Sequence, residues 1–177
     1  MLYINQLLIS ILCLMNTYTI DFDNKEVKNW NIVNDGVMGG LSKGRVEAIP
    51  EGFHFYGNVS LENNGGFTSF QSPNRDYALK GYEWVEIRYK SKGIENALQL
   101  SVADRFYIPN YKVHLPLSDD WVVRSFPLNE VRQYRVGDPT GEFLDQEALS
   151  EVIRLSFITD EKKAGDFHLL VDYVKFK

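Results

Sequence analysis

Apolar and polar residues alternate along most of this chain. Val85, Ile87 and Tyr89 are separated by charged residues. The same alternation runs through four further segments, at residues 53–61, 98–102, 153–157 and 167–176. A period of two is typical of strands that bury one face. Turn-forming Gly, Pro and Asn residues separate the segments, and many short strands at this spacing predict a β-sandwich or barrel.

Two places depart from the simple alternation. The last segment also carries Leu170, Val174 and Phe176, which predicts a strand with apolar residues on both faces. Asp145–Val152 has helical character, because Leu149 and Val152 share one side and acidic residues fill the first turn, where the helix dipole favours them. The chain is therefore expected to be all-β, with one short helix before the penultimate strand.

Two glycine-rich stretches, residues 34–42 and 61–69, interrupt this pattern. Glycine is used where φ must be positive or where another group approaches closely. The candidate binding residues in these stretches are Asn34, Asp35, Gly36, Met38, Gly39, Gly40, Ser42, Asn63, Asn64, Gly65, Gly66 and Phe67. One interpretation is a shared surface that presents polar groups to a partner. In the other, short side chains such as Asp35 bond to backbone amides and only hold the loops in shape; both can hold at once.

The two stretches occur in order with Trp121–Leu128 and a closing segment, Gly165–Phe176. Together they resemble the CIA30 family (complex I intermediate-associated protein 30) from about Ile20 to the end of the chain. Gln71 stands where the family pattern usually has a basic residue, and residues 91–93 replace its usual Gly-Asp-Gly turn.

The resemblance implies a galactose-binding-like jelly roll, a form of β-sandwich in which the first and last strands lie together. It also implies an assembly factor or chaperone for respiratory NADH:ubiquinone oxidoreductase (complex I), with complex I subunits or assembly intermediates as protein partners. Fold alone does not fix function, so this role rests on the resemblance.

Composition narrows the classes of function. The 177 residues carry a formal charge of −5 with both signs spread along the chain. Phosphate binding needs clustered Lys and Arg, so a nucleic-acid partner is not expected. The single cysteine, Cys13, allows neither an intrachain disulfide nor a cysteine metal site.

Residues 1–18 are expected to stand apart from the domain at residues 19–177. They contain an apolar run of signal-peptide length, but no Lys or Arg precedes it and no small-x-small cleavage pattern follows. The segment is either an atypical leader, which favours export or the cell envelope over the cytoplasm, or an apolar strip that packs on the domain.

No catalytic constellation is visible, so the chain is expected not to be an enzyme and to need no cofactor. His54, His114 and His168 lie in strand patterns, without a nucleophile elbow or a His-x-x-x-His spacing. The glycines do not match the spacing of a dinucleotide-binding turn.

Two ligand hypotheses remain beside the protein partner. Asp21, Asp23 and Asp172 would suit calcium if the terminal strands pair, but the favoured interpretation is that they are solvated or bonded to amides, so no metal site is expected. A carbohydrate-binding module of an exported protein is the alternative function. It would use an aromatic face built from Tyr82, Trp84, Tyr107, Tyr111 and Trp121, of which Trp84 points outward from its strand.

Overall fold

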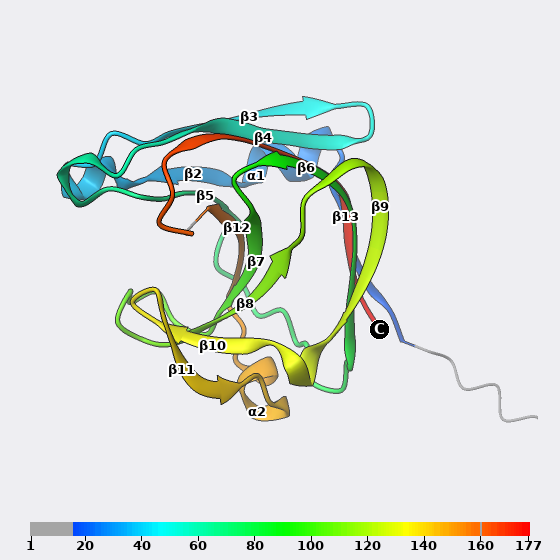
Figure 1. Cartoon of the computed structure of the whole chain (residues 1–177). Helices are drawn as coiled ribbons and strands as arrows, with labels where there is room; N and C mark the ends of the chain where they lie inside the picture. Colours follow the sequence, from blue (N-terminus) through cyan, green and yellow to red (C-terminus); the bar gives the residue numbers. More distant parts are fainter. Residues whose placement is uncertain (1–15, 160) are drawn as a thin grey trace, which may run out of the picture.

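The computed structural model describes residues 16–159 and 161–177, which form two packed β-sheets (Figure 1). The first sheet has six strands. Its order is β3 (Lys43–Ile49), β4 (Gly52–Val59), β13 (Gly165–Phe176), β6 (Trp84–Gly93) and β9 (Ser118–Pro127), with β1 (Tyr18–Asp21) also pairing with β13. All of these pairings are antiparallel, and the pairing of β1 with β13 brings the first and last strands together as expected.

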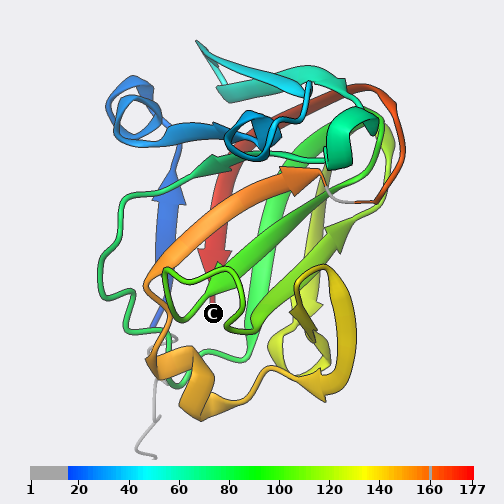
Figure 2. The same cartoon turned by 90° about the vertical axis from the view of Figure 1, so that its left-hand side faces the viewer.

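The second sheet has seven strands. Its order is β11 (Asp138–Phe143), β10 (Arg132–Arg135), β8 (Asn110–Leu115), β7 (Asn96–Ser101), β12 (Arg154–Thr159), β5 (Thr68–Gln71) and β2 (Asn31–Asn34). In Figure 1 the outer pairs β2–β5 and β10–β11 extend to the left of the middle strands, so the sheet curves and its outer face is concave. Figure 2 looks onto this concave face. The predicted all-β sandwich is confirmed.

An aromatic cluster fills the space between the sheets. The Phe22 ring lies 4.7 Å from Phe53 and 5.1 Å from Trp30, both edge-on, and Phe53 lies 5.0 Å from Phe70. Phe22, Phe53 and Phe70 are fully buried. Edge-to-face contacts of this kind add to the hydrophobic gain of burying the rings, so this cluster is a main anchor of one sheet on the other.

Strand β13 buries alternating residues in two different phases. Phe167, Leu169 and Val171 face the core, and after a register shift between Val171 and Tyr173 the core residues are Val174 and Phe176. A β-bulge inserts one residue and so moves the inward set by one position. The expected second apolar face of this strand is therefore wrong, because Val174 and Phe176 share the core with the earlier residues.

The two α-helices are short. The predicted helix is α2 (Gln146–Ser150), capped by the Asp145 carboxylate, which accepts from the Ala148 amide at 2.8 Å. The sequence reading missed α1 (Asn24–Asn29), which begins after Asp23; this carboxylate accepts from the amides of Lys25 and Glu26. A single turn with an Asp cap leaves too few residues for a helical period to stand out. None of the helices in the described part of the chain is long and apolar enough to cross a membrane.

The domain starts earlier than residue 19. Tyr18 lies in β1, its ring stacks on Phe176 at 6.2 Å, and its hydroxyl accepts from Arg75 at 2.8 Å. Tyr18 therefore belongs to the domain and not to the expected leader. Residues 1–15 of that segment, including Cys13, lie outside the described residues.

Candidate functional site

The two glycine-rich stretches form one structural unit, here called the loop pair (residues 34–42 and 60–67). The first contains a 3-10 turn, η1 (Asp35–Met38), and the second contains η2 (Glu62–Asn64). They meet because β2 pairs with β5 and places Asn34 opposite Thr68. Both lie at the left end of the molecule in Figure 1.

The Asp35 carboxylate joins the two loops. It is 1% exposed, and its Oδ1 accepts from the Ser42 amide at 3.0 Å. Its Oδ2 accepts from the Ser42 hydroxyl at 2.5 Å and from the amides of Gly66 at 2.7 Å and Phe67 at 3.3 Å. Four donors from both loops therefore converge on one buried anion.

The pKa of Asp35 lies below its ordinary value. Burial by itself raises that pKa, but the hydrogen bonds from Ser42, Gly66 and Phe67 stabilise the charged form and outweigh burial. The carboxylate is thus ionised at neutral pH, where it contributes to the stability of the folded state.

Two glycines are required by this close approach. A Cβ added to Gly40 would lie 2.3 Å from the Asp35 Cγ, and one added to Gly65 would lie 2.6 Å from the Asp35 Oδ2. Gly39 has φ +89°, a left-handed conformation that side chains disfavour.

Asn34 links the loop pair to both sheets, because its side-chain Oδ1 atom accepts hydrogen bonds from the Gly44 amide on β3 and the Thr68 hydroxyl on β5.

The outer surface of the loop pair differs from the one expected from the sequence. Asp35 and Ser42 are buried, and their polar atoms are directed into the loops. The side-chain Oδ1 atom of Asn34 accepts hydrogen bonds from within the domain. None of these groups therefore faces a partner. Asn63 and Asn64 are exposed in left-handed conformations, φ +55° and +59°. Among the candidates Gly36 and Gly39 are also exposed, whereas the side chain of Met38 lies outside the described part of the structure.

Two leucines missed by the sequence reading stand on this surface. Leu41 is 49% exposed and Leu61 is 46% exposed. Each adjoins a serine of a hydrogen-bonded pair: Ser42 donates to the Ser60 carbonyl at 3.2 Å and accepts from its amide at 3.1 Å. The loop pair therefore holds two apolar side chains beside the exposed asparagines.

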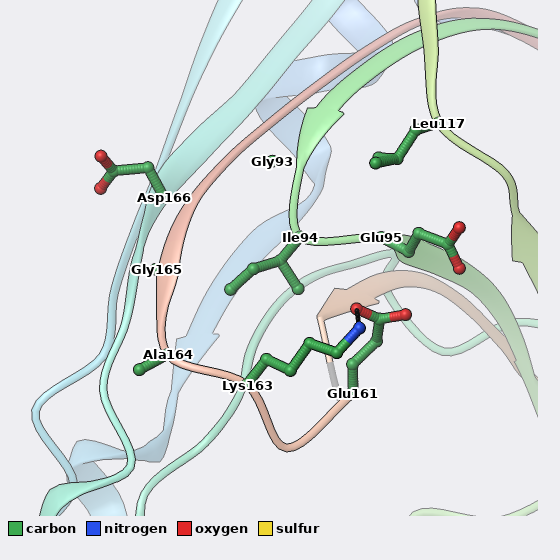
Figure 3. Close-up of a pocket in the computed structure, with 9 residues that line it drawn as sticks. All are labelled: Gly93, Ile94, Glu95, Leu117, Glu161, Lys163, Ala164, Gly165 and Asp166. Carbon is green, nitrogen blue, oxygen red and sulfur yellow. Dashed lines mark hydrogen bonds and ion pairs between the residues drawn. The ribbon is translucent and has the colours of Figure 1, made fainter.

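A pocket of about 510 Å³ opens at the same end of the sandwich (Figure 3). Glu95, Glu161 and Lys163 meet on its wall, and Lys163 pairs with Glu161 at 3.3 Å. Burial, and then the neighbouring Glu161 carboxylate, raise the pKa of Glu95. The pocket wall thus combines acidic groups with one cation.

Trp84 does not join the loop pair. It begins β6, whose other end, Gly93, pairs with Phe167 near the loops. A ten-residue strand spans about 30 Å at roughly 3.3 Å per residue. Trp84 is 41% exposed and lines a separate pocket of about 340 Å³ with residues of α2.

The expected aromatic face does not form. Tyr111 is buried in the core. Tyr82 is partly buried and packs against the core beside Phe176. Trp121 lies in the first sheet under the Arg88 guanidinium, 4.5 Å from the ring centre, whereas Tyr107 lies in the loop after β7. The aromatic residues that were grouped by sequence point to different parts of the molecule.

Two of the three aspartates proposed for calcium are used elsewhere. Asp23 caps α1, and Asp172 pairs with Arg88 at 2.5 Å. Within residues 16–159 and 161–177, no group of three or more His, Cys, Asp or Glu side chains is placed to hold a metal ion.

The concave face carries a site that the sequence did not reveal. One residue from each of six neighbouring strands lies in a continuous register across the seven-stranded sheet. We call these residues the polar row: Asn31, Gln71, Ser156, Gln99, Lys112 and Arg132. Their strand neighbours, such as Phe70, Leu98, Leu100 and Phe157, are core residues, so the polar row faces outward.

Several polar atoms on this face have spare bonding capacity. Ser156 is 1% exposed, and its hydroxyl has no hydrogen-bond partner among the described residues. The Oδ1 atom of Asn110, two residues before Lys112 on β8, also has no such partner. Gln71 and Gln99 donate their amide groups along the strands to Ser69 and Ser101. Neighbouring atoms cover these two groups, so the polar side chains that a ligand could reach on this face include the half-buried Gln71 and Gln99 and the exposed Arg132.

Tyr134 flanks the polar row. Its hydroxyl lies 3.1 Å from the His114 Nε2 atom, and the Lys112 ammonium lies 4.9 Å from its ring centre. Burial, together with Lys162, lowers the pKa of Lys112 to about 8. The face thus combines amides, hydroxyls, cations and one half-buried aromatic ring.

Comparison with known families decides the classification. The model of the family described as complex I intermediate-associated protein 30 (CIA30) matches residues 20–171. The chain belongs to the CIA30 family. No curated protein matches it by sequence.

Solved structures with the same fold include carbohydrate-binding modules and an adhesin domain. A family 11 carbohydrate-binding module of a Clostridium thermocellum cellulosomal cellulase aligns over 91% of this chain and 94% of its own, with 15% identity and a TM-score of 0.62. The same type of module from that organism, in complex with a β-1,3-1,4-mixed-linked tetrasaccharide, aligns over 90% and 94%, with 15% identity and a TM-score of 0.57. The K2 cleaved adhesin domain of Lys-gingipain covers 92% and 99%, with 12% identity and a TM-score of 0.50. At these identities the likeness establishes the fold alone.

Proposed function

We propose that this CIA30 protein is a non-catalytic binding protein that associates with assembly intermediates of respiratory NADH:ubiquinone oxidoreductase. The observation that carries the proposal is the family match over residues 20–171, which includes both glycine-rich stretches. CIA30 is named for its association with complex I intermediates, and a sandwich that holds its loops rigidly suits a binding role.

The loop pair is the proposed contact surface. Its shape is fixed by the Asp35 network before any partner arrives, so little conformational entropy is lost on binding. Leu41 and Leu61 supply apolar area, and the exposed asparagines Asn63 and Asn64 supply polar groups at its rim.

The test is capture of complex I subunits from cells that contain both proteins. The double variant Leu41→Asp/Leu61→Asp should lose co-migration with identified complex I subunits in native gels while its melting temperature stays within a few degrees. Val123→Asp is the matched control, because Val123 is 54% exposed on β9, away from the loop pair. Ser42 is unsuitable for this purpose because it is buried and holds the loop. Equal recovery of subunits by the double variant and by wild-type protein would contradict the proposed surface.

A second candidate function, carbohydrate binding, is favoured by the polar row. Rows of amides and hydroxyls on a concave face, with an aromatic ring beside them, suit the hydroxyl-rich surface of a glycan. The strand register that aligns the side chains of Asn31, Gln71 and Gln99 on the concave face is the specific observation that supports this candidate.

Calorimetry with a mixed-linkage β-glucan tetrasaccharide and a glycan array test this candidate. Gln99→Ala and Tyr134→Ala should each weaken binding about tenfold or more, as removal of one good polar or stacking contact does. Trp84→Ala is the informative comparison, because Trp84 lies on the other sheet. Loss of binding in Trp84→Ala alone would move the site away from the concave face, and absence of any glycan binding would remove this candidate.

A further inference from the structure

The outer face of the six-stranded sheet holds a chain of hydrogen bonds from a carboxylate through two imidazoles. The His54 Nδ1 atom lies 3.0 Å from a Glu47 carboxylate oxygen, and the His54 Nε2 atom lies 3.0 Å from the His168 Nδ1 atom. Strand pairing explains the contact: Glu47 is directly opposite His54 on β3 and β4, and His54 and His168 are diagonal neighbours on β4 and β13.

The carboxylate assigns the tautomers of this chain. An ionised Glu47 accepts only, so the proton of His54 is on Nδ1 and its Nε2 carries a lone pair. His168 then donates from Nδ1 to that lone pair. The two ring nitrogens thus face each other across this hydrogen bond, and His54 is held by a carboxylate of the kind that orients metal-bound histidines.

The spacing of the two nitrogens suits a metal ion. Imidazole nitrogens bind Zn²⁺ at about 2.0–2.1 Å, so two ligands at angles between 90° and 109° lie roughly 2.9–3.4 Å apart. The observed separation of 3.0 Å falls in this range. We propose that His54 and His168 form a two-imidazole surface site for a divalent transition-metal cation such as Zn²⁺ or Cu²⁺, with water in the remaining coordination positions.

Metal binding needs only a small rearrangement. The rings turn so that both lone pairs meet at the metal, and the His168 proton moves from Nδ1 to Nε2 through solvent, so no net proton is released from the neutral pair. The side chain of His54 is 18% exposed, and His168 is exposed. Imidazole ligands select zinc, copper and nickel over magnesium or calcium, with copper the tightest.

Other charged groups on this face set the strength of the site. Lys92 is opposite His168 and pairs with Asp119 at 3.1 Å, and Lys90 is opposite Leu170, the partner of His54. Arg45 is opposite Tyr56, whose ring stacks 4.5 Å from His54. These cations oppose a bound metal and Glu47 favours it, so the Glu47 carboxylate is expected to matter for affinity.

The experiment titrates untagged full-length protein with Zn²⁺, Ni²⁺ and Cu²⁺ by calorimetry in a non-chelating buffer. We expect one metal per chain, affinity reduced at least tenfold in His54→Gln and in His168→Gln, and about tenfold in Glu47→Ala. His114→Gln is the matched control, because His114 lies on the other sheet, and Cys13→Ser tests for a contribution from the thiol. Binding should also weaken on acidification, because protonated imidazole cannot ligate.

A second measurement reports the ligands directly. The Cu²⁺ electron paramagnetic resonance spectrum of wild-type protein should show coupling to two imidazole nitrogens, reduced to one in either histidine variant. The proposal would be overturned if wild-type protein bound no metal, or if either His54→Gln or His168→Gln bound the metal as tightly as wild-type protein. Complex I capture and glycan binding are expected to be unchanged in His168→Gln, so this test is independent of both proposed functions.

Discussion

The loop pair and the polar row use polar side chains in opposite ways. In the loop pair, the Asp35 carboxylate receives four hydrogen bonds and is almost completely buried. In the polar row, the Ser156 hydroxyl is equally buried and has no partner among the described residues. In the loop pair the buried polar atoms of Asp35 all have hydrogen-bond partners, whereas in the polar row one buried hydroxyl has none among the described residues.

This difference separates residues that maintain the fold from those that can meet a ligand. An unpaired buried hydroxyl costs free energy and adds no hydrogen bond to the fold. A carboxylate with all its donors in place has no such capacity. The buried polar groups of the glycine-rich loops therefore hold the loops in shape, and only the outer side chains, such as Leu41 and Leu61, can contact a partner. The alternating strands, by contrast, carry the polar side chains of the polar row.

The largest expected effect is that of Asp35→Asn. An amide presents a donor where Gly66 and Phe67 also donate, and each hydrogen bond to a charged group contributes about 1.5–3 kcal/mol. We expect a loss of about 3 kcal/mol in the free energy of unfolding, measured by urea denaturation. Asp120→Asn, at an exposed site on β9, is the control and should change stability by less than about 0.5 kcal/mol. Similar urea midpoints for the two variants would refute a structural role of Asp35.

The same substitution has a pH signature. The pKa of Asp35 is lowered in the folded state, so its stabilising effect is complete above the ordinary carboxyl pKa of about 3.9 and is lost as pH falls through the lower folded value. The stability gap between wild type and Asp35→Asn should therefore be constant near neutral pH and narrow below about pH 4. A gap that stays the same at pH 3 would argue against an ionised carboxylate.

Replacing glycines of the loop pair should lower the free energy of unfolding by an intermediate amount, and shows which glycines the loop pair requires. Gly40→Ala places a Cβ 2.3 Å from Asp35 and should cost about 2 kcal/mol through displacement of the carboxylate. Gly39→Ala should cost about 1 kcal/mol because φ is positive. Gly36→Ala meets no atom within 4 Å and serves as the control. Chemical denaturation of the three variants ranks them, and a cost for Gly36→Ala equal to that of Gly40→Ala would break the assignment.

The smallest expected effect is in the polar row. Ser156→Ala removes an unpaired hydroxyl, so stability should stay within about 0.5 kcal/mol of wild type or rise. Ser42→Ala removes a hydroxyl bonded to a buried carboxylate and should cost about 1.5 kcal/mol. Thermal unfolding of the pair tests the contrast between the regions. A larger cost for Ser156→Ala would mean that this hydroxyl supports the fold.

Part of the site was predictable from the sequence. The glycine spacing, the polar residues between the glycines and the apolar neighbours indicated a constrained loop, and Asp35 was named as a residue able to hold it. The exposure of Leu41 was not found, because a loop has no periodicity from which exposure can be read. Leu61 was counted in the alternating segment 53–61, but β4 ends at Val59 and Leu61 is exposed. The bulge in β13 was read as a second apolar face, since an inserted residue and a double-sided strand look alike in a linear pattern.

The sequence by itself determined the all-β class, helix α2, five of the described strands (β4, β6, β7, β12 and β13) and the inward face of the first four of these. These features depend on local periodicity and turn chemistry. Only the tertiary structure decided which strands are neighbours. The polar row joins residues between positions 31 and 156, and the imidazole pair joins positions 54 and 168. Such contacts depend on strand order and register, which are fixed by packing of the whole sandwich rather than by any local segment.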